Sequence, residues 1–235
     1  MTTTLVTGAN KGIGYETARR LVAAGHTVYV GARDAERGRE AAERLGARFV
    51  QLDVTDDASV TAAAETVEAG GGLDVLVNNA GVEGRTSDGG VIGAAEVTAD
   101  QLRDLYETNV FGIVRVTGAF LPLLRRSANP VVVNVSSGLG RTADLADPAS
   151  FTHFYQGVAY PSSKAALNMV TVQYAKAFPE MRINAVDPGY TKTDLNHNTG
   201  FQTVEQGAEA TVRLARTGPD GPTGGFFAAS GPVAW

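Results

Sequence analysis

The chain has 235 residues, 43% of them hydrophobic and 19% charged, which is enough to bury one large core without stabilising disulfides or metal ions. It contains no cysteine and its three histidines (His26, His153 and His197) are far apart, so we expect no disulfide, thiolate nucleophile or metal site, and a reducing cytoplasm as the location. The net charge of −5, without a basic run, argues against nucleic acid or an anionic membrane as partner, and the excess of arginine over lysine, 16 to 4, points to a bacterial genome with GC-rich codons.

Short β-branched segments alternate with longer alanine-rich, charged segments, a pattern typical of strand–helix units on a parallel sheet. The predicted strands are Thr4–Thr7, Thr27–Gly31, Arg48–Leu52, Asp74–Asn78, Pro130–Ser136, Arg182–Val186 and Gly225–Ala228. The predicted helices are Gly12–Ala24, Asp34–Leu45, Asp56–Ala69, Asp100–Arg126, Tyr160–Phe178 and Val204–Arg216. Asp34 and Asp56 stand at helix starts, and Gly25, Gly46 and Gly70 stand at helix ends, as capping requires. We therefore predict one doubly wound, Rossmann-type α/β domain, residues 1–235, with a mostly parallel seven-stranded sheet.

Three longer segments interrupt this rhythm, and each follows the carboxyl end of a predicted strand. They are Gly81–Val97, Gly138–Ala159 and Gly189–Thr203. An open α/β sheet binds its ligand at that edge, so we expect the functional site there. No signal peptide is expected, because the N-terminus has no basic start followed by an apolar stretch. The longest apolar region, Val110–Leu124, contains Arg115 and is too short to span a bilayer, so it is predicted to be a buried helix.

A glycine-rich turn connects the first predicted strand to the first predicted helix and reads Thr7-Gly8-Ala9-Asn10-Lys11-Gly12-Ile13-Gly14. Gly8 permits an unusual turn dihedral, Gly12 lets the backbone approach a pyrophosphate, and Gly14 lets the helix pack close to the strand. The helix N-terminus adds free N–H groups and a positive dipole. The glycine spacing differs from the usual dinucleotide motif, so on its own this turn also fits a purely structural role.

The choice of nucleotide depends on the charges just past the second predicted strand, where the sequence reads Val30-Gly31-Ala32-Arg33-Asp34. An acid at that place binds the ribose 2′-hydroxyl of NAD, whereas a basic residue binds the 2′-phosphate of NADP. Arg33 occupies it, and Lys11 approaches from the glycine turn, so NADP(H) is favoured over NAD. Asp34 is the counter-argument, but it is also expected to cap a helix. Asp53 either accepts a hydrogen bond from the adenine amino group or forms a local turn.

Tyr160 and Lys164 lie four residues apart at the start of a predicted helix and therefore share one face. A phenol with a pKa near 10 is a poor acid or base at neutral pH. An ammonium about 5 Å away, at an effective dielectric of about 20, favours the phenolate by roughly 3 kcal/mol, or about two pK units. The pair predicts an acid–base group, although such a pair also occurs on solvated helix faces.

Further motifs accompany that pair in chain order: Asn78-Asn79-Ala80-Gly81, Asn109, the strand ending in Ser136-Ser137, and Asp187-Pro188-Gly189. With them the whole chain resembles the short-chain dehydrogenase/reductase family. Within that family it is most similar to carbonyl reductases, on the segments Gly8-Ala9-Asn10-Lys11-Gly12, Ala32-Arg33-Asp34, Gly72 to Gly81, Val133 to Ser137 and a tail ending in Trp235.

The resemblance implies a role for each candidate residue. Tyr160 would donate the proton in reduction, Lys164 would lower its pKa and hold the nicotinamide ribose, Ser137 would bind the substrate oxygen, and Asn109 would help hold a water that relays protons to Lys164. Thr191 would contact the carboxamide. The expected cofactor-binding set, from the turn and the resemblance together, is Gly8, Asn10, Lys11, Gly12, Ile13, Gly14, Arg33, Asp53, Val54, Asn79, Ala80, Gly81, Tyr160, Lys164, Pro188, Gly189 and Thr191.

Two segments leave alternatives open. Adjacent strand residues face opposite ways, so only one of Ser136 and Ser137 meets the substrate unless the strand has already ended, and the family pattern favours Ser137. Phe151, Phe154, Tyr155 and Tyr190 either line an apolar, aromatic substrate pocket or pack their loops onto the body. Residues 196–200 are polar and glycine-containing, as a lid over substrate would be.

The expected function is NADPH-dependent reduction of a ketone or aldehyde to an alcohol, with a small-molecule substrate that is apolar or aromatic. Alternatives are a related dehydrogenase of a sugar, steroid or 3-oxoacyl substrate, an NADP-binding redox sensor without turnover, and a structural interaction module. Loop Gly138–Ala159 is shorter than the insertion of monomeric carbonyl reductases, so a monomer is not implied. In related families the helices equivalent to Asp100–Arg126 and Tyr160–Phe178 form a four-helix contact, so a homodimer or homotetramer is also an expectation.

Overall fold

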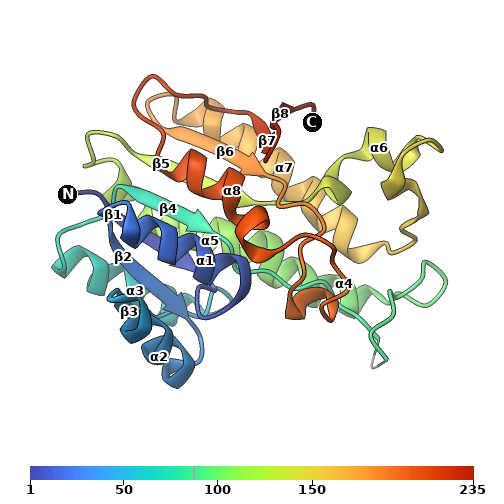
Figure 1. The fold of residues 1–235 in the computed structure, drawn as a ribbon, viewed down its shortest axis with the longest axis horizontal. Helices are drawn as coiled ribbons and strands as arrows, with labels where there is room; N and C mark the ends of the chain where they lie inside the picture. The colour runs from blue at the N-terminus through green and yellow to red at the C-terminus, as the bar shows by residue number, and fades with distance from the viewer. Residues whose placement is uncertain (87) are drawn as a thin grey trace.

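The computed structural model describes residues 1–86 and 88–235. In this part of the chain one sheet runs in the order β3-β2-β1-β4-β5-β6-β7-β8, and all neighbours pair in parallel except β7 and β8 (Figure 1). The strands are β1 (Thr3–Thr7), β2 (Thr27–Ala32), β3 (Arg48–Gln51), β4 (Val75–Asn78), β5 (Val131–Val135), β6 (Arg182–Val186), β7 (Phe226–Ala228) and β8 (Gly231–Val233). The predicted doubly wound fold and its seven strands are confirmed. The eighth strand was not predicted, because three residues that include Pro232 carry too weak a pattern.

Helices cover both faces of the sheet. The helices in the described ranges are α1 (Gly12–Ala23), α2 (Ala35–Leu45), α3 (Asp57–Ala69), α4 (Ala99–Tyr106), α5 (Gly112–Leu124), α6 (Thr142–Ala146), α7 (Ala159–Ala177) and α8 (Val204–Ala215). None of the helices in the described ranges is long and apolar enough to cross a membrane. The predicted single helix Asp100–Arg126 is confirmed as a continuous helical stretch but not as a regular α-helix, because a π-helical segment, Glu107–Phe111, lies between α4 and α5. A π turn has no distinct hydrophobic period, so the sequence reads as one continuous helix.

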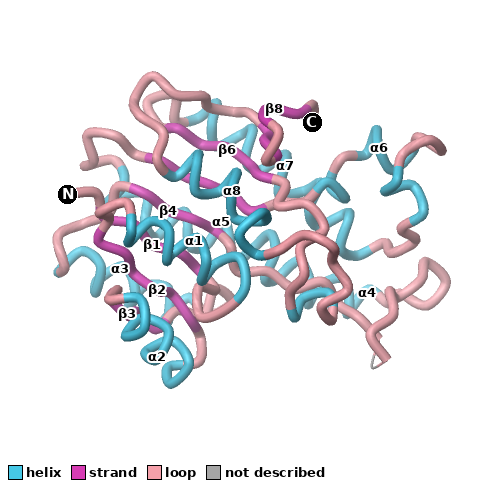
Figure 2. Tube along the Cα trace, viewed as in Figure 1, coloured by secondary structure: helices cyan, strands magenta, loops and turns pink. Residues whose placement is uncertain are grey.

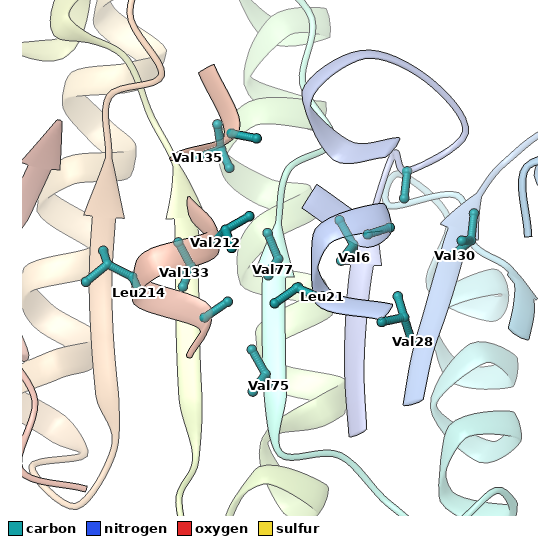
Figure 3. Packing of buried hydrophobic residues seen from close by; sticks show 14 of the residues in the cluster. Val6, Leu21, Val28, Val30, Val75, Val77, Val133, Val135, Val212 and Leu214 are labelled. Atoms are coloured by element: carbon teal, nitrogen blue, oxygen red, sulfur yellow. The ribbon is translucent and has the colours of Figure 1, made fainter. Parts of the chain in front are cut away.

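Alternating strand residues face two separate parts of the core. Val6, Val77 and Val133 pack against α1, α2 and α8, with Leu21, Val212 and Leu214 among their partners (Figure 3). On the other face Leu5, Leu76 and Val132 pack against α3, α5 and α7. Burial on both faces explains why these strands are almost wholly apolar in sequence.

The predicted helix punctuation is present. The Asp34 side chain accepts a hydrogen bond from the Arg37 N–H, and Asp56 accepts from the N–H groups of Ala58 and Ser59. Gly46 ends α2 in the left-handed conformation, with φ 64°. Gly70 ends α3 for a different reason: its φ is −82°, but a Cβ there would lie 1.8 Å from Tyr29 Oη.

A chain of buried polar side chains crosses the sheet beneath its carboxyl edge. Asn78 Nδ2 donates to Asn134 Oδ1 (2.9 Å) and to Thr117 Oγ1 (3.2 Å), and Asn134 Nδ2 donates to Thr171 Oγ1 (2.9 Å). These side chains come from β4, β5, α5 and α7, so the network ties two neighbouring strands to two helices. The loops that follow the carboxyl ends of β4, β5 and β6, together with α4 and α6, lie beyond this edge (Figure 2).

Candidate active site

The glycine turn has the geometry that its sequence predicts. Gly8 and Gly12 have φ values of 63° and 58°, a region that favours glycine. A Cβ on Gly14 would lie 2.4 Å from Asn79 Nδ2 and 2.7 Å from the Gly8 carbonyl oxygen, so only glycine lets α1 come this close to β1 and β4. Lys11, the N-cap residue of α1, makes no side-chain capping bond, which leaves the first-turn N–H groups available to an anion.

The end of β4 holds this turn in place. Thr7 Oγ1 accepts hydrogen bonds from the N–H groups of Asn79 and Ala80, both at 2.9 Å. Asn79 Nδ2 donates to the carbonyl oxygens of Thr7 (2.8 Å) and Gly8 (3.2 Å). Asn10 and Ile13 lie in the same turn, and Ile13 packs against the core. The uncapped helix start and the glycine-only contacts together fit a dinucleotide pyrophosphate.

The residues expected to choose the nucleotide are spread around the ends of β2 and β3. Arg33 is exposed directly after β2. Lys11 Nζ forms an exposed ion pair with Asp194 at 2.8 Å, so in this structure its ammonium is bound to the segment after β6. Asp53 Oδ1 accepts from both the N–H and the hydroxyl of Thr55, which is the local turn expected as the alternative to an adenine contact. Val54, next to it, is buried.

Tyr160 and Lys164 lie on the first turns of α7 and are both buried; Lys164 is 4% exposed. Lys164 Nζ donates to the Val135 carbonyl oxygen at 2.9 Å and lies 5.6 Å from the centre of the Tyr160 ring. Burial lowers the pKa of Lys164 to about 8. The pair is therefore a buried one, and a solvated helix face is excluded.

The pKa of Tyr160 moves opposite to the expected direction. Burial raises this pKa, the nearby Glu83 carboxylate raises it further, and a hydrogen bond from Ser137 acts the other way. The sequence predicted that Lys164 would lower this pKa, whereas in this structure burial and nearby carboxylates raise it and the Lys164 ammonium donates to the Val135 carbonyl oxygen. In this state Tyr160 is a protonated phenol at neutral pH.

The two serines after β5 face different surroundings. Ser136 is buried and its hydroxyl donates to Asn168 Oδ1 at 2.6 Å, inside the contact with α7. Ser137 is partly exposed, accepts from the Leu139 N–H at 3.1 Å, and lies close enough to the Tyr160 phenol to lower the pKa of that phenol. Strand β5 ends at Val135, and only Ser137 reaches the tyrosine.

Asn109 lies in the π-helical segment and is fully buried. Its amide exchanges two hydrogen bonds with Val82, accepting from the N–H at 2.9 Å and donating to the carbonyl oxygen at 2.8 Å, and it donates to Ser163 Oγ at 3.1 Å. A Cβ on Gly81 would lie 3.3 Å from Asn109 Oδ1 and 3.7 Å from Lys164 Nζ. Gly81 therefore lies between these two candidate residues.

The segment after β6 forms the last part of the candidate site at the carboxyl edge of the sheet. Gly189 has φ 69°, and its N–H donates to Asp187 Oδ1 at 2.9 Å. Thr191 is buried and its hydroxyl donates to the Pro188 carbonyl oxygen at 2.9 Å. Within the region expected to be a lid, Asn196 is buried and donates to the Thr191 carbonyl oxygen at 2.8 Å.

The four aromatic residues of the loops lie in different environments. Tyr155 lines a cavity of about 400 Å³ that Tyr160 also borders. Phe151 and Phe154 are 77% and 76% exposed, and neither lines that cavity. Tyr190 packs edge-on against Phe201, with ring centres 5.8 Å apart. Only Tyr155 is therefore placed as a pocket residue.

Two charged residues of this region were missed from the sequence. The Glu83 side chain is 6% exposed and forms a bidentate pair with Arg85, at 2.7 and 3.0 Å, while Tyr155 Oη donates to Glu83 Oε1 at 3.1 Å. Charges two residues apart in a glycine-rich loop look like solvated surface, so composition gave no signal. Their position directly after Asn79-Ala80-Gly81 was the available clue. In residues 1–86 and 88–235 no cluster of three or more His, Asp or Glu side chains suits a metal ion.

A dinucleotide turn, a buried tyrosine–lysine pair and a serine at one sheet edge define an oxidoreductase of the Rossmann class. The family model described as short chain dehydrogenase matches residues 2–203. The chain is 37% identical to (+)-neomenthol dehydrogenase of Arabidopsis thaliana, over 95% of this chain and 94% of that protein. It is 33% identical to salutaridine reductase of Papaver bracteatum, over 95% of this chain and 93% of that protein.

A crystal structure of NADPH-bound carbonyl reductase from chicken fatty liver superimposes with a TM-score of 0.85 and 30% identity, covering 100% of this chain and 99% of that one. The chain belongs to the short-chain dehydrogenase/reductase family. The alignment to the Arabidopsis protein spans 279 positions, more than the 235 residues of this chain, so that relative carries segments that have no counterpart here.

Proposed function

We propose that this protein reduces a ketone or aldehyde to an alcohol with NADPH. The observation that carries the proposal is the convergence of Tyr160, Ser137 and Lys164: the Ser137 hydroxyl lies close enough to the Tyr160 phenol to lower its pKa, and the Lys164 ammonium lies 5.6 Å from the centre of the Tyr160 ring. The names of relatives, which include reductases acting on several small molecules, support the same class of reaction.

The residues divide the chemistry among them. NADPH, when bound, supplies the hydride. Tyr160 donates its proton to the carbonyl oxygen as that oxygen becomes an alcohol, and Ser137 holds the oxygen by a hydrogen bond. The raised pKa of Tyr160 suits this direction, because a proton donor must be protonated at the start of the step. Lys164 holds the nicotinamide ribose, and Asn109, fixed by Val82 and Ser163, positions a water beside Lys164.

For the nucleotide, we propose that Gly8, Asn10, Gly12, Ile13 and Gly14 bind the pyrophosphate. Asp53, Val54, Asn79, Ala80 and Gly81 border the adenosine and ribose, and Pro188, Gly189 and Thr191 the nicotinamide end. Arg33, exposed after β2, carries the preference for NADPH, and Lys11 joins it only if its ion pair with Asp194 opens. The NADPH in the chicken carbonyl reductase structure supports this choice.

The test is Tyr160→Phe against a panel of ketones and aldehydes, followed by NADPH consumption. General acid catalysis contributes about 10²- to 10⁴-fold, so kcat/KM should fall by that factor while NADPH affinity stays within about threefold. The matched control is Tyr190→Phe, because this phenol lies outside the reacting group and bonds only to Thr199 among the described contacts. A Tyr160→Phe enzyme that keeps full activity would refute the mechanism.

The same panel separates the alternatives. A sugar, steroid or 3-oxoacyl dehydrogenase would turn over its own class and leave simple ketones unchanged. A redox sensor would bind NADPH and consume none with any substrate. The intact Ser137, Tyr160 and Lys164 favour an enzyme, since a sensor needs no acid–base group.

For assembly, we propose a dimer through the outer faces of α5 and α7. Phe111 and Val114 in the α5 region and Met169 on α7 are exposed, although they are large and apolar. Sedimentation equilibrium of the wild-type protein and of Met169→Lys tests this, with a shift to monomer expected for the variant.

A further inference from the structure

The cavity beside Tyr160 has a charged wall. It measures about 400 Å³ and lies between the loop after β4, α4 and the segment Tyr155–Tyr160. Roughly 300–1,000 Å³ is usual for small-molecule sites, so its size suits a ligand. Its charged lining residues, in the described part of the chain, are Glu83, Arg85 and Asp104.

The buried Glu83–Arg85 ion pair in the cavity wall contributes little to folding stability. Both side chains are nearly buried, at 6% and 12% exposed, and the desolvation of a buried ion pair cancels most of its attraction. Apolar residues of similar size would serve folding at least as well. A pair retained at the wall of a cavity next to Tyr160 therefore points to recognition.

The bonding of the pair fixes where its charge faces. Arg85 uses Nε and one Nη on Glu83 and the other Nη on the Gly89 carbonyl oxygen at 2.9 Å, and Tyr155 donates to Glu83 from the opposite segment. These contacts hold the carboxylate between the loop and Tyr155, at the cavity surface. Its field also reaches the Tyr160 phenol.

The lining charge does not cancel. Glu83 and Asp104 contribute two negative charges against one positive charge from Arg85, which leaves the wall net negative. Asp104 is exposed to solvent, whereas Glu83 is nearly buried and shares the lining with Val82, Val91 and Ile92, and an apolar surround weakens the dielectric screening of the Glu83 charge.

We propose that this cavity receives the part of the substrate remote from the reacting carbonyl, and that its net negative wall selects a substrate with an amine there over one with a carboxylate. The inference rests on the proposed reductase function and adds the substrate class to it. Glu83 and Asp104 are specificity-determining residues, and Arg85 holds the Glu83 carboxylate in place.

The experiment compares three ketones of one shape: 4′-(aminomethyl)acetophenone, 4-acetylbenzoic acid and the neutral 4′-methylacetophenone. At neutral pH they carry a positive, a negative and no charge at the same position. The measured quantity is the ratio of kcat/KM for the amine to kcat/KM for the acid, with the neutral ketone as the reference for general damage.

The variants form a charge series. Asp104→Asn and Glu83→Gln each remove one negative charge from the wall, and the combination removes two. Each step should lower the amine-to-acid ratio by about tenfold, which is about 1.4 kcal/mol. The double variant Glu83→Gln/Arg85→Gln keeps the wall charge, so its ratio should stay within about threefold of wild type. Asp100→Asn is the matched control, because Asp100 pairs with exposed Arg103 outside the lining and changes the protein charge equally.

The outcomes are separable. The inference is overturned, while the reductase function stands, if the amine-to-acid ratio of kcat/KM does not change with the wall charge or falls equally in Asp100→Asn. Absence of turnover with all three ketones in the wild-type enzyme overturns the proposed function and the inference with it. If Glu83→Gln fails to fold because Arg85 is left unpaired, Asp104→Asn and the Glu83→Gln/Arg85→Gln double variant decide the question alone.

Discussion

The glycine turn and the region around Tyr160 and Lys164 restrict their residues in different ways. A methyl group on Gly14 would lie 2.4 Å from Asn79 Nδ2, whereas burial of the Lys164 ammonium lowers its pKa to about 8. The glycine turn is limited by space: its contacts are backbone and amide groups, satisfied by Thr7 and Asn79. The Tyr160 and Glu83 region is limited by charge, because burial opposes every ionised group in it.

The difference predicts two kinds of failure. Substitutions in the glycine turn should weaken stability and cofactor binding together. The close packing of Gly14 against Asn79 and Gly8 both holds α1 in place and shapes the proposed nucleotide site. Substitution of Lys164, a buried charge that donates only to a backbone carbonyl oxygen among the described contacts, should lose activity and gain stability, because functional sites retain groups that folding alone would not.

The largest expected effect is that of Lys164→Met. We expect kcat/KM to fall about 10³-fold, because the cation that we propose holds the nicotinamide ribose beside Tyr160 is gone. Stability should rise by about 2 kcal/mol at neutral pH, since one pKa unit is about 1.4 kcal/mol and the lost bond to Val135 offsets part of the gain.

The pH dependence has a definite sign. The folded pKa of Lys164, about 8, lies below the ordinary lysine value of 10.5, so the buried charge destabilises the wild type below about pH 8. The unfolded chain binds the extra proton between these values, so wild-type stability rises with pH and the advantage of the variant disappears by about pH 10.5. Urea unfolding of both proteins across this range measures it; a constant difference would contradict the buried charge.

Gly14→Ala tests the steric restriction in the glycine turn. The new Cβ collides with Asn79 and with backbone at Gly8, so we expect a loss of about 3 kcal/mol in unfolding free energy and weaker NADPH binding in parallel. Gly118→Ala on α5 is the matched control, because its Cβ would meet no atom within 4 Å and alanine is the better helix former by about 1 kcal/mol. Equal effects at the two glycines would refute the steric account.

Arg33→Asp should change nucleotide choice with little effect on folding, because the residue is exposed. We expect the preference for NADPH over NADH, taken from dissociation constants, to fall by about tenfold or more, as a favourable charge pair becomes a repulsive one. Arg39→Asp on α2 controls for net charge. An unchanged ratio in Arg33→Asp would remove the assignment.

The smallest effect is that of Asp34→Ala, which removes the cap of α2. Stability should fall by about 1 kcal/mol, as for Asp56→Ala on α3, while the nucleotide preference stays as it is. A shift of preference toward NADPH would show that Asp34 also reads the ribose.

Sequence alone predicted what depends on local pattern. The strands, the capping by Asp34 and the positive φ of Gly8 follow from period, polarity and the lack of a Cβ, which are properties of neighbouring residues. The π-helical segment was missed, and with it the contact that Asn109 makes there with Val82, which lies 27 residues away in sequence.

The electrostatics of the site depended on packing as well. Tyr160 and Lys164 were placed together correctly, but the direction of the Tyr160 pKa was not, because burial and Glu83 come from segments distant in sequence. The same holds for Glu83 and Arg85, whose burial beneath Tyr155 follows from how two loops meet.

The buried amides beneath the sheet edge act as a check on strand alignment. Asn78 and Asn134 are directly opposed in the β4–β5 pairing, with Thr117 and Thr171 on either side. A shift of the pairing by one residue would turn Asn134 to the other face of the sheet and leave these buried polar groups without hydrogen-bond partners. Each such group would lower the free energy of unfolding by about 1–3 kcal/mol. Asn79 follows one of these strands and Ser136-Ser137 the other. The strand pairing that satisfies these buried amides is thus also the pairing that places Asn79 and Ser136-Ser137 at the ends of adjacent strands, so one set of hydrogen bonds fixes both the core and the site.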